Sequence, residues 1–453
     1  MNKKEFKRCM QKGLGRCMLT LKQAKSIEPY RDIVLWGCLH NLSYDTQCEG
    51  TRAAYIYRLA SMFHDDEYFV SPTVKAFETL PRRSDWTFLH FCELLGMFAQ
   101  NGNREARKAL YQKYDTVLSK LVQKRRFSGY DFERDSMEHI CIVLIELDGD
   151  EALLRIAKDL GWLFLENPHY KADDFDWLCF DIGDSFGKEN AKKLLATAAK
   201  TSPDTARFLE QYVDSLQEQE HSPHRNDPPP PSTADTVADE IDRTGTVSYI
   251  SKLRLSKKAD EAERKKLAQK AIDEPDPDKK VALLSAFAFS DCGFPLPHKI
   301  LIEYAKSPSD ALRDMALNIL MDCKSREVHD YAKALLLSGD APDQAVSMLI
   351  TNYTPADKPL LLAELYLMKV DYKDTSSWHG TGLQILNAFE KGAKLPREAL
   401  EHIYETTLCS HCRADAVREM EKRGWLTPAI IEELPYDCNT RLTEMINRST
   451  PKP

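Results

Sequence analysis

The densest group of polar and aromatic side chains in the sequence lies between positions 44 and 55. If a helix begins here, Glu49, Arg52 and Tyr55 stand one turn apart and share one face. The Arg52 guanidinium could bind a carboxylate or a phosphate through two parallel hydrogen bonds. Asp45 could cap the helix or accept a hydrogen bond from a partner. An internal hydrogen-bond network that locks a helical hairpin is the first interpretation, and a partner-binding patch is the alternative; the candidate residues for that patch are Tyr44, Asp45, Gln47, Glu49, Arg52 and Tyr55.

A second group is Ser-Trp-His-Gly-Thr-Gly at 377–382. Its glycines and histidine are compatible with a phosphate cradle, but the lysine-containing phosphate-loop pattern is missing and no strand precedes it. Aromatic residues often dominate protein interfaces. A close helix–helix contact or a turn is the first interpretation, and Trp378 and His379 are the candidate partner-binding anchors of the alternative.

Two stretches carry residues that bind metals elsewhere. The acidic run from Asp173 to Asp184 could hold a hard cation, but it lacks the spacing of a twelve-residue calcium loop, and acidic residues in a first turn favour a helix start. Cys409 and Cys412, with His402 and His411 nearby, have zinc-ligand chemistry, yet a structural site needs four ligands and no second pair follows. We expect no metal and no cofactor.

Catalytic motifs are missing from the sequence. It contains no nucleophile elbow, no zinc-protease helix, no kinase set and no dinucleotide fingerprint. We therefore lean towards a protein that is not an enzyme.

The charge balance argues against a polyanion-binding surface over the whole molecule, because the formal net charge is -8. Two local stretches, 1–25 and 104–126, are nevertheless basic. Solvated helix faces are the first interpretation and a phosphate-binding face is the alternative. The candidates for that alternative are Arg104, Arg107, Lys108, Lys124, Arg125 and Arg126.

The sequence predicts a soluble, cytoplasmic protein without a membrane partner. The first residues are mostly charged and no apolar run reaches the ~18 residues that a bilayer requires. The twelve cysteines are scattered, and in a reducing compartment they act as small core residues.

A proline-rich segment divides the chain. Residues 218–235 contain four consecutive prolines, Pro228–Pro231, and no large apolar residue. Proline fixes φ and lacks a backbone donor, so this stretch should be extended. We expect an N-terminal helical domain at 1–217, a flexible linker at 218–235 and a C-terminal repeat domain at 236–453.

The C-terminal half repeats. Turn signals precede apolar helical runs at steps of about 33 to 36 residues, which is typical of stacked helical hairpins. The clearest repeat is 307–338: Asp310 is expected to cap its first helix, and the second should stop at Ser338-Gly339.

The N-terminal half should form a second, less regular array. The glycine content is low and period-two apolar patterns are hard to find, which favours an all-α chain. Asn101-Gly102-Asn103 and Asp148-Gly149-Asp150 should be turns between helices. The helices are expected at 31–42, 51–63, 70–80, 86–100, 104–123, 134–147, 150–165, 173–182 and 188–216.

The pattern formed by Asp310, Arg313 and Ala316 resembles the inner-helix signature of HEAT repeats, and 414–418 is a looser match. The resemblance covers about 270–440 and departs from the family at 370–380. It implies an α-solenoid of HEAT-like antiparallel helical hairpins, here in two arrays joined by the linker.

Our main functional hypothesis is a non-catalytic scaffold or adaptor that binds a protein partner on an extended helical surface. The alternative is a nucleic-acid-binding HEAT-like protein that uses the two basic stretches; some bacterial HEAT-like proteins are alkyl-base DNA glycosylases, for which Asp176 and Trp177 would be the nominees. A different enzyme or a metal protein is the third hypothesis. The oligomeric state is left open.

Overall fold

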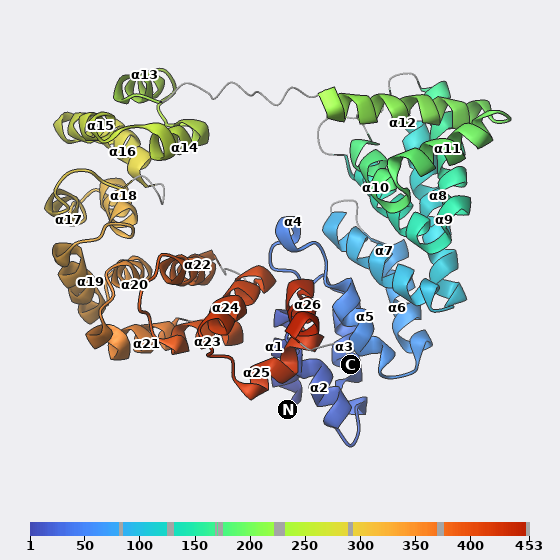
Figure 1. Cartoon of the computed structure of the whole chain (residues 1–453), viewed down its shortest axis with the longest axis horizontal. Coiled ribbons are helices and arrows are strands. Elements are labelled where there is room, and N and C mark those ends of the chain that lie inside the picture. The colour runs from blue at the N-terminus through green and yellow to red at the C-terminus, as the bar shows by residue number, and fades with distance from the viewer. Residues whose placement is uncertain are drawn as a thin grey trace. The chain divides into compact units, whose positions relative to one another are not determined.

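The computed structural model describes residues 1–80, 85–124, 131–167, 170, 175–221, 232–288, 293–368 and 376–449. Within these ranges every regular element is a helix, so the all-α prediction is confirmed (Figure 1). None of the described helices is long and apolar enough to cross a lipid bilayer. The chain divides into two compact units, which are described separately.

Unit 1 comprises residues 1–224, 408–411 and 427–453. Its helices, apart from the first residues of α24, are α1 (Lys3–Lys12), α2 (Arg16–Gln23), η1 (Glu28–Tyr30), α3 (Arg31–Cys38), α4 (Thr46–Glu49), α5 (Ala53–Ser61), α6 (Asp66–Glu78), α7 (Asp85–Gln100), α8 (Arg104–Gln123), α9 (Phe132–Glu166), α10 (Asp176–Phe186), α11 (Lys188–Ala199), α12 (Pro203–His221), α25 (Pro428–Glu433), η5 (Leu434–Tyr436) and α26 (Thr440–Ser449).

The helices of unit 1 pack in sequence order. Helix α5 packs on α7 and α7 on α9, while α6 and α8 form a second row beside them. An aromatic cluster lies in this core, with the ring centroid of Phe77 5.2 Å from that of Phe88 and 6.0 Å from that of Phe91. Gly149, with φ 55° and ψ -125°, interrupts α9, so the turn expected at this position is present inside the long element.

Glu138 is a buried carboxyl in the core of unit 1, where only 7% of it is exposed. Burial raises its pKa to about 8; Arg134 opposes this shift and Asp135 adds to it. In the unfolded chain this pKa should return to its ordinary value, so the folded form binds the proton more tightly. The resulting stability is therefore present at low pH and is lost as the pH rises towards about 8.

We expect Glu138→Gln to raise the free energy of unfolding by on the order of 2 kcal/mol at neutral pH. The variant should also flatten the decline in stability between pH 5 and about 8. Urea unfolding at several pH values measures both effects. Glu151→Gln on an exposed turn of the same helix is the control, and identical pH profiles for the two variants would contradict the assignment.

Unit 2 comprises residues 225–407 and 412–426. Helix α24 (Ser410–Lys422) belongs to this unit from Cys412 onward. The other helices of unit 2 are α13 (Ala234–Thr244), α14 (Tyr249–Lys258), α15 (Glu261–Asp273), α16 (Pro277–Leu284), η3 (Ser285–Phe287), α17 (Lys299–Tyr304), α18 (Asp310–Leu320), α19 (Arg326–Ser338), α20 (Pro342–Thr351), η4 (Pro355–Asp357), α21 (Lys358–Leu367), α22 (Ser376–Glu390) and α23 (Arg397–Thr406).

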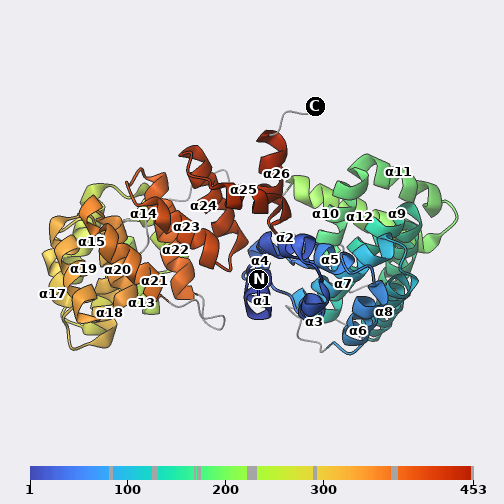
Figure 2. The ribbon, with the colours of Figure 1, turned by 90° about the horizontal axis from the view of Figure 1, so that it is seen from below.

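Stacked hairpins build unit 2. Helices α16, α18, α20 and α22 pack on one another in turn. Beside this row, α17 packs on α19 and α21 packs on α23. Figure 1 shows the successive hairpins side by side, and in Figure 2, which is turned by 90°, the same hairpins overlap. Each helix therefore covers the apolar stripe of its neighbours, which is the repeat arrangement that the sequence predicted.

A buried carboxylate ties two of these hairpins together. Asp357 Oδ2 lies 2.8 Å from His329 Nε2, and Asp357 Oδ1 accepts a hydrogen bond of 3.1 Å from Lys333 Nζ. Thr354 donates both its backbone N–H and its hydroxyl to the same carboxylate. Burial alone would raise the pKa of Asp357, but these hydrogen bonds outweigh it and hold the pKa well below its usual range.

The start of α18 corrects one prediction. Ser309 occupies the N-cap position with extended backbone angles, and Asp310 is the first helical residue. Because its own backbone is helical, the Asp310 carboxylate pairs instead with Arg313, at 2.7 Å. The predicted stop is confirmed, since Gly339 ends α19 with φ 77°.

The expected domain boundaries and the compact units differ at the C-terminus. Residues 427–449 pack in unit 1, where Arg16 Nε lies 2.9 Å from Glu433 Oε1 and the Cys438 backbone N–H donates to the Gly13 carbonyl at 2.9 Å. The linker expected to be extended at 218–235 is helical at both ends, because residues 218–221 belong to α12 and residues 234–235 to α13. Residues 222–231 lie outside the described residues.

Candidate partner-binding surfaces

The group at 44–55 is largely an internal network of unit 1. Arg52 Nη2 lies 2.8 Å from Glu49 Oε2, and each side chain is only 2% exposed. Arg52 also donates to the carbonyls of Gln11 at 2.6 Å and Leu408 at 2.5 Å, while Glu49 accepts the Ser410 N–H at 2.8 Å. The charged pair thus joins three separate segments of the chain.

The remaining members of this group divide between interior and surface. Asp45 caps α4 by accepting the backbone N–H groups of Gln47 and Cys48, at 3.1 and 3.3 Å. Tyr55 is buried, and its hydroxyl donates to the Leu14 carbonyl at 2.8 Å. Among the six candidates, Gln47 is exposed and Tyr44 is half-buried. The structure therefore places Glu49, Arg52 and Tyr55 out of reach of a partner.

Trp378 is also a core residue rather than an exposed anchor. Only 4% of it is exposed, because its ring packs edge-on against His402 with centroids 5.0 Å apart. Its neighbour His379 is half-buried.

A ring nitrogen of His379 and the Cys412 sulfur, both in unit 2, lie within 4.8 Å of each other. These two atoms are two of the four ligands that a structural zinc site needs.

The residues of the acidic run that the structure describes lie in different environments. Asp173 and Asp174 lie outside the described residues. Asp176 begins α10 and accepts a hydrogen bond from the Ser215 hydroxyl at 2.9 Å, whereas Trp177 is 72% exposed. The two residues nominated for a base-excision pocket therefore stand in different surroundings.

The basic stretch at 104–126 is partly neutralised by ion pairs. Arg107 pairs with Asp148. Lys124 Nζ lies 2.7 Å from Asp131 and 2.6 Å from Glu133. Arg104 and Lys108 are exposed on α8, and Arg125 and Arg126 lie outside the described residues. The cations here are therefore tied in part to carboxylates of the same unit.

The basic stretch at 1–25 is used partly for packing. Lys7 Nζ stands 3.9 Å from the centroid of the Trp36 ring, and Lys22 makes the same contact with Tyr436 at 3.9 Å. Arg16 is bound by Glu433. Lys3, Lys4, Arg8 and Lys25 are exposed.

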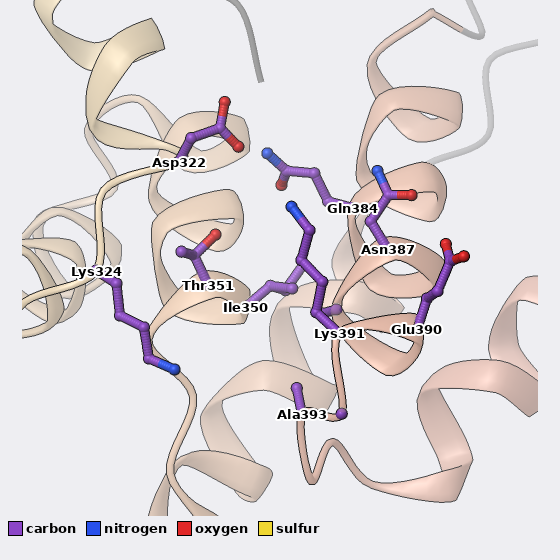
Figure 3. A pocket seen from close by; sticks show the side chains of 11 residues that line it. Asp322, Lys324, Ile350, Thr351, Gln384, Asn387, Glu390, Lys391 and Ala393 are labelled. Atoms are coloured by element: carbon purple, nitrogen blue, oxygen red, sulfur yellow. The ribbon is translucent and has the colours of Figure 1, made fainter. Parts of the chain in front are cut away.

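Unit 2 contains two adjoining cavities, which we call the unit 2 groove. One has a volume of about 510 Å³ and the other of about 520 Å³. Asp322, Gln384 and Asn387 line both cavities, so the two lie next to each other. Figure 3 shows the first of them, in which the Gln384 side chain of α22 points towards Asp322, which lies just after α18, while Thr351 at the end of α20 lies nearby.

Side-chain amides from three helices that are neighbours in the stack line the unit 2 groove. Asn318 comes from α18, Gln344 from α20, and Gln384 and Asn387 from one face of α22. Residues 380, 384 and 387 follow helical spacing, so α22 presents one continuous face to the groove. Sequence reasoning missed these amides, because polar residues on an exposed helix face look the same whether or not they line a hollow.

The charges around the groove are mixed. Asp322, Asp343 and Glu390 stand among Lys324 and Lys391. Both signs are therefore present, and the groove does not concentrate either a cationic or an anionic ligand.

Comparisons with known proteins add little to this geometry. The sequence matches no protein-family model and no curated protein. Among solved structures, the crystal structure of an engineered protein aligns with 96% of this chain and 97% of its own length, at 12% identity and a TM-score of 0.17. A TM-score this low carries no argument about fold or function.

Proposed function

We propose that this protein is a non-catalytic scaffold or adaptor of the HEAT-like repeat type that holds a protein partner on the helical surface of unit 2. We also propose that this protein is soluble and cytoplasmic. The observation that carries it is the unit 2 groove, a depression shared by consecutive stacked helices. A groove of this kind offers side chains from several repeats to one extended ligand.

The chemistry of the groove supports a protein ligand more than a nucleic acid. Its lining carries both signs of charge and several uncharged amides, whereas phosphate binding depends on clustered cations. In unit 1, Arg107 and Lys124 are paired with carboxylates, so the basic stretch at 104–126 has fewer unpaired positive charges than the sequence indicates.

The test is recovery of a partner with the tagged full-length chain from its native cells. We expect one protein at a stoichiometric ratio that co-migrates through size exclusion after nuclease treatment and at about 0.3 M salt, where phosphate contacts are weakened. The double variant Arg104→Glu with Lys108→Glu is the control, and it should recover the same partner. Recovery that disappears with nuclease, or in the α8 variant, would favour the nucleic-acid alternative.

A further inference from the structure

We propose that His379, Cys409 and Cys412 bind a zinc ion at the start of α24. This inference goes beyond the proposed function and does not depend on it. Thiolate sulfur and imidazole nitrogen are ligands that zinc prefers in proteins. His379 comes from the first turn of α22, and Cys412 from the first turn of α24.

His379 and Cys412 supply the geometry of the zinc site. A ring nitrogen of His379 and the Cys412 sulfur lie within 4.8 Å of each other. A tetrahedral zinc ion, with bonds of about 2.3 Å to sulfur and about 2.0 Å to nitrogen, holds two such atoms about 3.5 Å apart. Both side chains turn about single bonds, so they can close the remaining gap without a shift of the backbone.

Cys409 supplies the third ligand through its place in the sequence. It precedes Cys412 by three residues, and α24 begins between them. This Cys-x-x-Cys spacing recurs in zinc sites because it lets two thiolates bind one ion. The positive end of the helix also stabilises the thiolate, which is the form of cysteine that binds metals. The sequence showed only this pair, and the fold adds His379 from a distant helix.

Burial favours a cation between these side chains. Cys409 is only 5% exposed and Cys412 only 3%. Thiolates in such surroundings need a compensating positive charge, and a zinc ion supplies it. Cysteines that only filled the core, or that formed a disulfide with each other, would leave the imidazole beside the Cys412 sulfur without a role. Water in the fourth position completes the tetrahedron, as in other zinc sites with three protein ligands.

The packing of unit 2 holds His379 in place. The preceding residue, Trp378, is buried, and its ring packs edge-on against His402 of α23 with centroids 5.0 Å apart. This contact anchors the first turn of α22, which carries the imidazole. The ion would then link α22 to the start of α24. Because only the folded chain brings these ligands together, zinc should stabilise the fold.

The experiment measures metal binding by the full-length chain, purified without a histidine tag. The reduced chain is stripped with a chelator and titrated with zinc in competition with a chromophoric chelator, and bound metal is counted by mass spectrometry. We expect one equivalent of zinc. With cobalt in its place, we expect the charge-transfer absorption of cobalt–thiolate bonds. His379→Ala and Cys412→Ser should each weaken zinc binding by about a hundredfold or more.

The matched control is Cys323→Ser. Cys323 is another cysteine of unit 2 that is only 3% exposed, and its thiol donates to the Ile319 carbonyl at 3.3 Å. This variant should keep the full zinc affinity. Thermal unfolding without metal verifies that each variant is folded, and zinc should raise the unfolding midpoint of the wild-type chain but not that of Cys412→Ser.

Three results would overturn the zinc site. The first is less than a tenth of an equivalent of zinc after reconstitution of the reduced chain. The second is a cobalt spectrum without thiolate charge transfer. The third is wild-type zinc affinity in folded His379→Ala or Cys412→Ser. Since none of these measurements involves a protein partner, their failure leaves the proposed scaffold role untouched.

Discussion

Replacing Arg52 with alanine should lower the free energy of unfolding of unit 1 by about 3–5 kcal/mol. The side chains of Arg52 and Glu49 are each only 2% exposed, so the variant leaves a carboxylate buried without its cation. It also removes the donors to the carbonyls of Gln11 and Leu408. Urea unfolding of the full chain measures the loss, and hydrogen exchange at Ser410 shows whether the neighbouring segment opens.

The control for this variant is Arg207→Ala. Arg207 forms an ion pair of the same spacing with Glu210, but the two side chains are 32% and 65% exposed. Solvent screens an exposed pair, so we expect a loss below about 1 kcal/mol. Equal losses for the two variants would show that burial of the Arg52 pair does not determine its contribution.

Gly161→Ala should destabilise unit 1 by about 3 kcal/mol or more. Gly161 lies in α9 where α12 crosses it, and a Cβ atom built there would stand 1.8 Å from the Asp204 carbonyl oxygen and 2.5 Å from its carbon. Because the obstacle is backbone, no side-chain rotation relieves the clash and α12 must shift. The drop in the thermal unfolding midpoint of the full chain is the measurement.

Gly380→Ala is the matched control, since it makes the same chemical change in another helix. No atom lies within 4 Å of the Cβ position at Gly380. The variant should be neutral or should stabilise α22 by roughly 0.5–1 kcal/mol, because alanine is the better helix former. A stabilised Gly161→Ala chain would mean that α9 and α12 are packed less closely than the structure shows.

The fold class and many of the turns could be predicted from the sequence because they depend on local patterns. Apolar spacing predicted most of the helices, but α1 and α2 were not expected and the helix expected at 188–216 is divided into α11 and α12. Gly149 and Gly339 marked a turn and a helix stop that the structure contains. The cap of α18 was misplaced by one residue, since serine and aspartate are both good caps and only the backbone angles separate them.

The site residues could not be predicted in the same way, because their surroundings are set by segments far along the chain. Leu408, whose carbonyl binds Arg52, is 356 positions away. Trp378 looked like an exposed anchor, but His402 from another helix covers it. The amides of the unit 2 groove carry no local signal, and only the stacking of α18, α20 and α22 brings them together.

The return of residues 427–449 to unit 1 has a consequence for biosynthesis. A ribosome makes α1 and α2 before unit 2, yet the Gly13 carbonyl receives its hydrogen bond from Cys438 and Arg16 pairs with the carboxylate of Glu433. All of unit 2 must be translated in between. The packing of α1 and α2 is therefore complete only after all of unit 2 has been translated, and a translation product that stops within unit 2 would leave this side of α1 and α2 exposed to chaperones and proteases.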